Sequence, residues 1–164
     1  MTVVDTGYNT MTGGRIKRIQ KYIGNEPFML TYGDGVSNVD INELIKFHNE
    51  KGQIATMTAI NIGQQFGCLD VNEDGSVLKF REKNEIDGNL INAGFMALEP
   101  QIFDYIEGDE TVFEKTPIEQ LAKDGQLNAF IHHGFWKCMD TVRDRNHLES
   151  LIENKKAPWI VWEE

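Results

Sequence analysis

Apolar positions along the chain follow two different spacings. Residues 28–32 (FMLTY) form a short apolar run bounded by turn residues, which is typical of a buried strand. In residues 15–22 isoleucines recur at helical spacing before Gly24, so this segment predicts a helix that ends at the glycine. A second helix is predicted to begin after Asp40, which is expected to cap it, and to end at Gly52. The first part of the chain therefore alternates helices and strands.

The same alternation continues to the end of the chain. Residues 53–60 are rich in β-forming residues and follow the second helix, so with residues 28–32 they predict a parallel strand pair joined by a right-handed crossover. Residues 66–71 and 76–80 flank an Asn-Glu-Asp-Gly turn and predict a hairpin. Further strands are predicted over residues 90–98, where Gly94 marks a bulge, and over residues 127–136. Further helices are predicted over residues 102–107, 116–124 and 143–154, the second of them capped by Thr116.

These elements predict an α/β fold with a mixed, mostly parallel sheet flanked by helices and an inserted β-hairpin. The chain of 164 residues is long enough to bury a core. It contains no internal repeat, low-complexity segment or linker. We therefore expect a single domain over residues 1–164.

The composition of the chain limits which kinds of partner and which cellular compartment are expected. The 16 basic and 26 acidic residues give a net charge of −10, which argues against nucleic acid or an anionic membrane as the main partner. Cys68 and Cys138 lie outside any metal-binding or redox spacing, which favours free thiols and a reducing compartment. No apolar stretch is long enough to span a bilayer, and the first residues lack the features of a signal peptide. A cytoplasmic protein is expected.

Charged residues follow several predicted strands. Asp34 lies between two glycines after residues 28–32, where it is either a solvated turn residue or a ligand-holding carboxylate at the carboxyl end of a strand. Asp140 and the segment 80–83 also follow strands; the simpler interpretations are a helix N-terminus and a solvated strand end. Two acids that converge on a divalent cation, with a lysine nearby, would suit phosphate chemistry.

The sequence does not support other metal-binding or catalytic motifs. Residues 70–81 begin like an EF-hand loop, but Arg81 occupies the position where a calcium-binding carboxylate is required. His132 and His133 are neighbours on a predicted strand and point to opposite faces, so they cannot chelate one ion. The chain has no GxSxG, HExxH, Walker or GxGxxG motif, which removes support for the corresponding hydrolases and oxidoreductases.

Six segments in order carry a family resemblance: DTG at 5–7, MTGGRIKR at 11–18, LTYGDGV at 30–36, FREK at 80–83, INAGF at 91–95 and FWKCMDTVRDRNHLE at 135–149. Their order and spacing resemble the later part of the sugar-phosphate nucleotidyltransferases, most closely the glucose-1-phosphate cytidylyltransferases. The resemblance extends over essentially the whole chain. It implies transfer of a cytidylyl group from CTP to glucose 1-phosphate, giving CDP-glucose and pyrophosphate, with Mg²⁺ as cofactor.

The family pattern also implies a role for individual residues. Asp34 and Asp140 would hold the metal, and Lys83, which would contact the sugar phosphate, completes the catalytic set. The other implied residues line substrate pockets: Gly13 and Gly14 beside the pyrimidine base, Glu82 on a sugar hydroxyl, and Gly67 and Asn92 in the hexose pocket.

One family feature is not found among these segments. The family begins with a strand and a GGxGTR-type loop that cradles the triphosphate, and the matching motifs here start after that loop. The expectation is therefore an enzyme fragment that is inactive or weak alone. The alternative is a non-catalytic sugar-phosphate-binding or scaffold module. In either case exposed strand edges predict a homo-oligomer.

Overall fold

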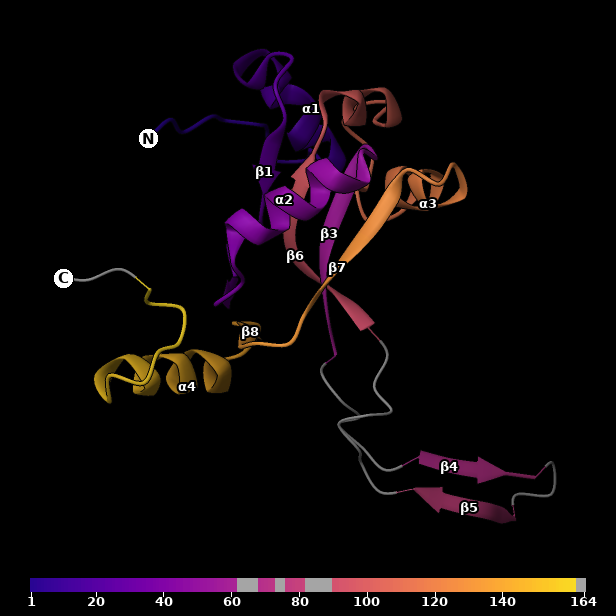
Figure 1. Cartoon of the computed structure of the whole chain (residues 1–164), viewed down its shortest axis with the longest axis vertical. Coiled ribbons are helices and arrows are strands. Elements are labelled where there is room, and N and C mark those ends of the chain that lie inside the picture. Colours follow the sequence, from indigo (N-terminus) through magenta and orange to yellow (C-terminus); the bar gives the residue numbers. More distant parts are fainter. Residues whose placement is uncertain (62–67, 73–75, 82–89, 162–164) are drawn as a thin grey trace.

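A four-stranded mixed sheet forms the centre of the molecule in the computed structural model, which describes residues 1–61, 68–72, 76–81 and 90–161 (Figure 1). The strand order is β1-β6-β3-β7, where the strands are β1 Phe28–Leu30, β6 Leu90–Leu98, β3 Ala55–Asn61 and β7 Leu127–His132. β6 pairs antiparallel with both β1 and β3, and β7 pairs parallel with β3. The predicted α/β class with a mixed sheet is confirmed.

The pairing within this sheet differs from the sequence prediction. Residues 28–32 and 53–60 do not form a direct parallel pair, because β6 lies between β1 and β3 and is antiparallel to both. β1 and β3 therefore run in the same direction without sharing hydrogen bonds. Two of the three pairings described here are antiparallel, so the sheet is not mostly parallel. A crossover helix sets the relative direction of two strands but does not prevent a later strand from entering between them.

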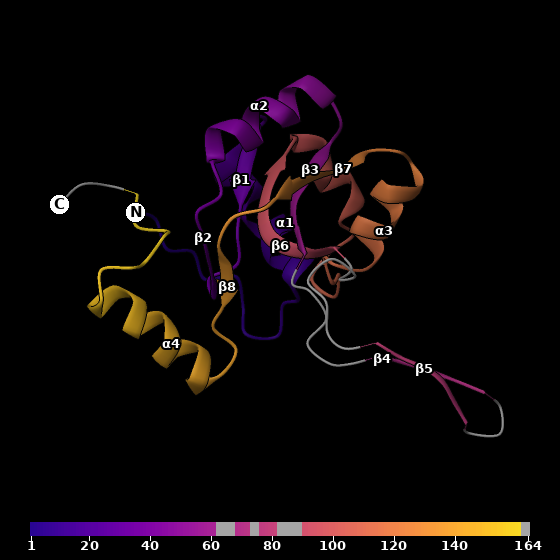
Figure 2. The same ribbon diagram turned by 60° about the horizontal axis from the view of Figure 1, so that its bottom comes forward.

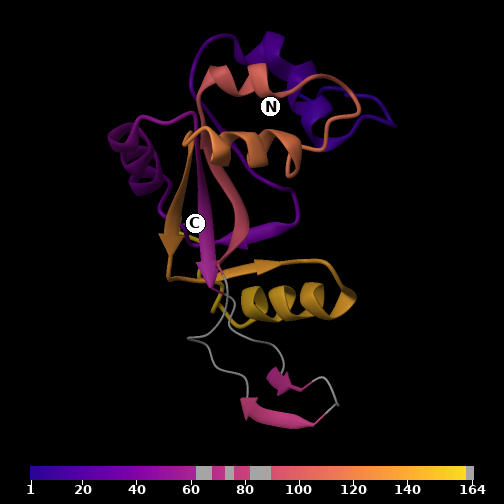
Figure 3. The same cartoon turned by 90° about the vertical axis from the view of Figure 1, so that its right-hand side faces the viewer.

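Helices cover both faces of the sheet. The helix α2, Ile41–Lys51, lies on one face, while α1, Thr12–Ile23, the 3-10 helix η1, Pro100–Tyr105, and α3, Thr116–Lys123, lie on the other (Figures 2 and 3). The core lies between the sheet and the second group of helices. Its buried members are Ile16, Ala55, Met96, Leu98, Ile102, Phe103, Ile106, Phe113 and Leu121.

The helix ends agree with the sequence in one case and differ in two others. The Asp40 side chain accepts hydrogen bonds from the backbone N–H groups of Asn42 and Glu43, which confirms it as the cap of α2. Thr116 is not the cap of α3, because Lys115 takes the N-cap position and the helix already begins at Thr116. The helix expected at 102–107 is the short η1, which begins earlier at Pro100.

The strand predicted over residues 127–136 is divided in two. β7 ends at His132, and β8, Trp136–Cys138, pairs antiparallel with β2, Gly35–Ser37, in a separate two-stranded sheet. The Asn38 side chain occupies the turn between β7 and β8, where it accepts a 2.7 Å hydrogen bond from the Phe135 N–H. The chain therefore leaves the central sheet and forms a ribbon with the segment that follows β1.

Two predictions about β-structure are confirmed. The hairpin consists of β4, Cys68–Val71, and β5, Val77–Arg81, which pair antiparallel in a sheet of their own. Gly94 has a φ of 86° and lies where the register of β6 against β3 shifts, as expected of a bulge. Within the ranges described, no helix combines the length and apolar character that membrane crossing requires.

Candidate active site

The ribbon of β2 and β8 brings Asp34 and Asp140 to neighbouring positions. Gly35 lies opposite Cys138 in the ribbon, and the Met139 N–H donates a 2.8 Å hydrogen bond to the carbonyl oxygen of Asp34. Asp34 occupies the turn between β1 and β2, and Asp140 connects β8 to the helix α4, Val142–Glu153. Two acids far apart in sequence thus come from adjacent strand ends, and their role as cation ligands stays a prediction.

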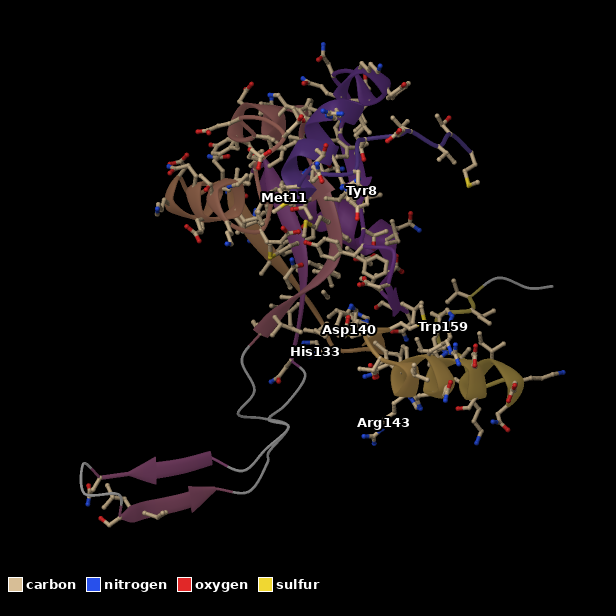
Figure 4. The ribbon with its side chains drawn as sticks, turned by 180° about the vertical axis from the view of Figure 1, so that it is seen from behind. Tyr8, Met11, His133, Asp140, Arg143 and Trp159 are labelled. Atoms are coloured by element: carbon tan, nitrogen blue, oxygen red, sulfur yellow. The ribbon has the colours of Figure 1, made fainter. Side chains whose placement is uncertain are left out.

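A cavity of about 750 Å³ adjoins Asp140. It is lined by Ile60, Asn61 and Ile91 from the central sheet and by the β7–β8 segment, including His133. Figure 4 shows Asp140 and His133 near each other at the end of the sheet where β7 leads toward β8. The volume of the cavity lies within the range of about 300–1,000 Å³ that is usual for small-molecule sites.

Trp136 attaches the ribbon to the central sheet. Its indole Nε1 donates a 2.8 Å hydrogen bond to the carbonyl oxygen of Ala93 in β6, and the side chain also lines the cavity. The hydroxyl of Ser37, which pairs with Trp136 at the same end of the ribbon, donates a 2.8 Å hydrogen bond to the carbonyl oxygen of Phe135. The Trp136 bond thus holds one end of the ribbon against β6, and the two acids lie beyond the opposite end.

The Asp140 carboxylate has a thiol as its neighbour. Cys138 Sγ donates a hydrogen bond to Asp140 Oδ2 over 2.9 Å. Burial and this carboxylate both raise the pKa of the Cys138 thiol above its ordinary value, which keeps the thiol protonated as a donor. One oxygen of Asp140 is thereby oriented by the protein itself.

The carboxylate of Asp144, in the first turn of α4, accepts several hydrogen bonds. It accepts from Lys137 Nζ at 2.6 Å, from Thr141 Oγ1 at 2.7 Å and from the Thr141 N–H at 3.1 Å. The lysine and the threonine lower the pKa of Asp144 to about 2. The Asp144 N–H in turn donates to Thr141 Oγ1, which completes a capping box. The Thr-x-x-Asp spacing could have predicted this cap, whereas nothing local marks Lys137 as its partner.

Asn92 lies on β6 beside Ala93, and both ends of its amide have partners. Oδ1 accepts a 2.9 Å hydrogen bond from the Gly94 N–H, and Nδ2 donates to the hydroxyl of Tyr32 at 3.4 Å. The Tyr32 hydroxyl donates to Glu114 at 2.7 Å. Burial and the Glu114 carboxylate raise the pKa of Tyr32, which is therefore a neutral donor. Sequence reasoning missed Tyr32 and Glu114, because no local spacing connects them.

Gly13 and Gly14 are buried at the start of α1, where they contact the turn before α3. The N–H groups of both glycines donate to the carbonyl oxygen of Thr111, at 2.9 and 3.3 Å. A Cβ on Gly13 would lie 2.7 Å from Thr111 O, and one on Gly14 would lie 2.6 Å from the backbone of Asp109. Close packing thus gives these glycines a structural role, and their implied position beside a pyrimidine base stays a prediction.

The remaining predicted residues, Gly67, Glu82 and Lys83, lie outside the described residues. The structure therefore brings together Asp34 and Asp140 and places Asn92 on the strand to which Trp136 attaches the ribbon. Gly13 and Gly14 are linked to Asn92 only indirectly. The hydroxyl of the preceding residue, Thr12, donates a 2.7 Å hydrogen bond to Glu114, the same carboxylate that accepts from Tyr32, the partner of Asn92.

The donor set of Asp34 and Asp140 has definite metal preferences. Within the described part of the chain, no three or more His, Cys, Asp or Glu side chains gather as a metal cluster. Asp34 and Asp140 together offer two carboxylates. This pair fits Mg²⁺, which commonly takes one or two carboxylates and completes its shell with water and substrate phosphates.

The structure is thus an α/β domain with two acids at adjacent strand ends, and a cavity adjoins one of them, Asp140. Residues 9–153 match the Nucleotidyl transferase family, and the chain belongs to that family.

Particular relatives share most of this sequence. The glucose-1-phosphate cytidylyltransferase of Salmonella typhi is 48% identical over 164 residues, which are 99% of this chain and 63% of the relative. A protein named probable glucose-1-phosphate cytidylyltransferase from Bacillus subtilis (strain 168) is 44% identical over 163 residues, again 99% of this chain and 63% of the relative. The chain thus spans 63% of the length of these curated relatives.

Solved structures share the fold. The crystal structure of a Bacillus anthracis protein assigned as a glucose-1-phosphate thymidylyltransferase superposes with a TM-score of 0.66 at 14% identity, covering 96% of this chain and 65% of that chain. At this identity the similarity supports the fold alone.

Proposed function

We propose that this chain carries the sugar-phosphate side of a nucleotidyltransferase that transfers a cytidylyl group from CTP to glucose 1-phosphate. The observation that carries the proposal is the ribbon that brings the backbones of Asp34 and Asp140 to neighbouring positions, with Asp140 beside the cavity. The identity of the substrates is supported by the names of the relatives at 48% and 44% identity.

In this proposal each residue has a separate task. Asp34 and Asp140 hold the divalent cation, which when bound neutralises charge on the phosphates. Lys83 supplies a point charge to the sugar phosphate, while Glu82, Gly67 and Asn92 contact the hexose. With the groups so fixed, a phosphate oxygen of glucose 1-phosphate attacks the α-phosphorus of CTP in line, and pyrophosphate leaves.

Isothermal titration calorimetry tests the proposal on this chain. We expect glucose 1-phosphate to bind more tightly with Mg²⁺ than without it, and expect Asp140→Asn to abolish the difference. Lys83→Ala should weaken glucose 1-phosphate binding both with and without Mg²⁺. Glu50→Gln, at an exposed position on α2, removes a carboxylate away from the ribbon and serves as the control.

The same titrations test whether the chain has a sugar-phosphate site, which both an enzyme fragment and a sugar-phosphate-binding module would have. Binding that Lys83→Ala weakens supports a preformed sugar-phosphate site. If neither glucose 1-phosphate nor CTP binds at any Mg²⁺ concentration, the chain is instead the scaffold module considered as the alternative.

Self-association is a second part of the proposal. β1 is an edge strand of the central sheet in the described part of the chain, and its Met29 side chain is 40% exposed. Unpaired strand edges with apolar side chains favour pairing with another chain. We expect a homo-oligomer by light scattering, and a monomer at all concentrations would contradict this.

A further inference from the structure

We propose that Lys137, Thr141 and Asp144 act as positioning residues, which together hold the Asp140 carboxylate in place for a divalent cation. This inference rests on the proposed function, because it takes Asp140 as a cation ligand. The three residues are called the clamp below. Nothing in the family resemblance or the relatives' names assigns them a role.

The contacts of the clamp surround Asp140 on both sides along the chain. Lys137 precedes it in β8, Thr141 follows it directly as the N-cap of α4, and Asp144 lies in the first turn of that helix. The Asp144 carboxylate accepts from Lys137 Nζ at 2.6 Å and from Thr141 Oγ1 at 2.7 Å. A strand residue and a helix cap are thus joined through one carboxylate, and Asp140 lies in the short connection between them.

The clamp matters because α4 has few other means of attachment. Leu148 is its one buried residue among those described. Beyond its C-terminal end, Trp159 stacks on Phe135 with ring centroids 5.2 Å apart, which ties the tail back to the start of the ribbon. Figure 1 shows α4 beside β8 and away from the helices that cover the central sheet. The beginning of α4, and with it Asp140, is therefore fixed mainly by polar contacts.

The geometry argues against a different role for Lys137. Lys137 lines the cavity described above and a second one that lies between Asp140 and the start of α4, so it could in principle be a free cation that receives a phosphate. Its Nζ is already paired with Asp144 at 2.6 Å, and the Asp144 side chain is only 17% exposed. A phosphate would have to compete with a well-shielded carboxylate for this ammonium group.

Mn²⁺ affinity measured by electron paramagnetic resonance on the full chain tests the clamp, because positioning and simple electrostatics predict opposite signs. Lys137→Met removes a positive charge near Asp140, so Coulomb attraction alone would make Mn²⁺ bind more tightly. Loss of positioning would make it bind more weakly. We expect affinity to fall by about tenfold, at the lower end of the range for residues that orient metal ligands. Lys137→Arg should restore most of it.

Neutral substitutions complete the test. Thr141→Val removes the hydroxyl that bonds Asp144 without changing charge, and it should also weaken Mn²⁺ binding, whereas Thr141→Ser should not. Glu149→Gln is the matched control, because it removes the 3.7 Å ion pair with Arg145 on the same helix but lies outside the clamp. Circular dichroism melting confirms that each variant is folded.

The outcomes separate the clamp from the proposed function. If wild type binds Mn²⁺ and Asp140→Asn abolishes binding, while Lys137→Met and Thr141→Val leave it unchanged or tighter, the clamp is wrong and the cation site stands. If wild type takes up no Mn²⁺, or Asp140→Asn has no effect, the proposed cation site is wrong and the clamp falls with it. Weaker binding in both clamp variants, with rescue by Lys137→Arg and Thr141→Ser, supports the inference.

Discussion

The central sheet and the β2–β8 ribbon are stabilised by different interactions. Around the sheet, Leu98, Phe103 and Phe113 are at most 1% exposed. In the ribbon every residue of both strands is only half-buried, and its attachments are hydrogen bonds such as that from Trp136 to the Ala93 carbonyl oxygen. Apolar burial contributes several kcal/mol for each large side chain, whereas one hydrogen bond contributes about 0.5–1.5 kcal/mol.

This difference separates stability from site geometry. The buried core decides whether the chain folds, and the polar contacts of the ribbon decide where Asp34 and Asp140 lie. Substitutions in the two regions should therefore have distinct signatures: global unfolding for the core, and altered binding or local opening for the ribbon.

The largest expected effect comes from Phe103→Ala. Phe103 is 1% exposed and stacks on Phe28 with centroids 5.6 Å apart, so truncation leaves a cavity at the centre of the core. We expect a loss of about 3–5 kcal/mol in the free energy of unfolding, measured by urea denaturation. Tyr22→Ala, at a side chain 58% exposed, should change it little. Equal losses in the two variants would contradict the division between core and surface.

Gly94→Ala should rank second. Gly94 has a φ of 86°, and an added Cβ would lie 2.5 Å from the Tyr32 ring. Gly125→Ala is the matched control, because Gly125 also has a positive φ of 67° but its Cβ would meet nothing within 4 Å. We expect Gly94→Ala to cost about 1–3 kcal/mol more than the control, because overpacking is added to backbone strain. Denaturation curves that coincide would show that the Tyr32 ring moves aside freely.

Elements with strong local signals could be predicted from the sequence. The α2 cap at Asp40, its end at Gly52 and the bulge at Gly94 follow from the side chain or φ preference of a single residue. The entry of β6 between β1 and β3 could not be predicted this way, because strand order depends on which buried faces meet across the whole chain. The split of residues 127–136 also depends on a distant residue, Asn38, whose side chain bonds the turn.

The candidate site divides in the same way. The sequence indicates Asp34 and Asp140 because each follows a strand, and the ribbon brings their backbones next to each other. The partners that hold the site, such as Lys137 for Asp144 and Glu114 for Tyr32, carry no periodic or motif signal. Side-chain pairs of this kind are set by tertiary packing, so they become visible only once the elements are assembled.

Trp136→Phe should have a smaller effect, confined to the ribbon. It keeps an aromatic ring but removes the 2.8 Å hydrogen bond to Ala93 O, at a cost of about 0.5–1.5 kcal/mol. Hydrogen exchange of the Met139 N–H, which bonds to Asp34 O, should speed up more than exchange in β3 and β6. Trp159→Phe preserves an aromatic ring against Phe135 and provides the control. A uniform increase in exchange through the sheet would mean that ribbon and core open together.

The smallest expected effect is the pH dependence contributed by Asp144. Its pKa is lowered to about 2 in the folded chain by Lys137 and Thr141, against a value near 3.8 without these partners. A group whose pKa is lowered by folding stabilises the folded state above its unfolded pKa, and this contribution disappears as pH falls through the folded pKa. The difference in free energy of unfolding between wild type and Asp144→Asn should thus be constant above about pH 5 and shrink toward about pH 2. Asp109, whose pKa is lowered by Arg18, adds to the acid sensitivity of both proteins and cancels in this difference. A difference that stays constant down to about pH 2 would show that Asp144 acts through hydrogen-bond geometry and not through its charge.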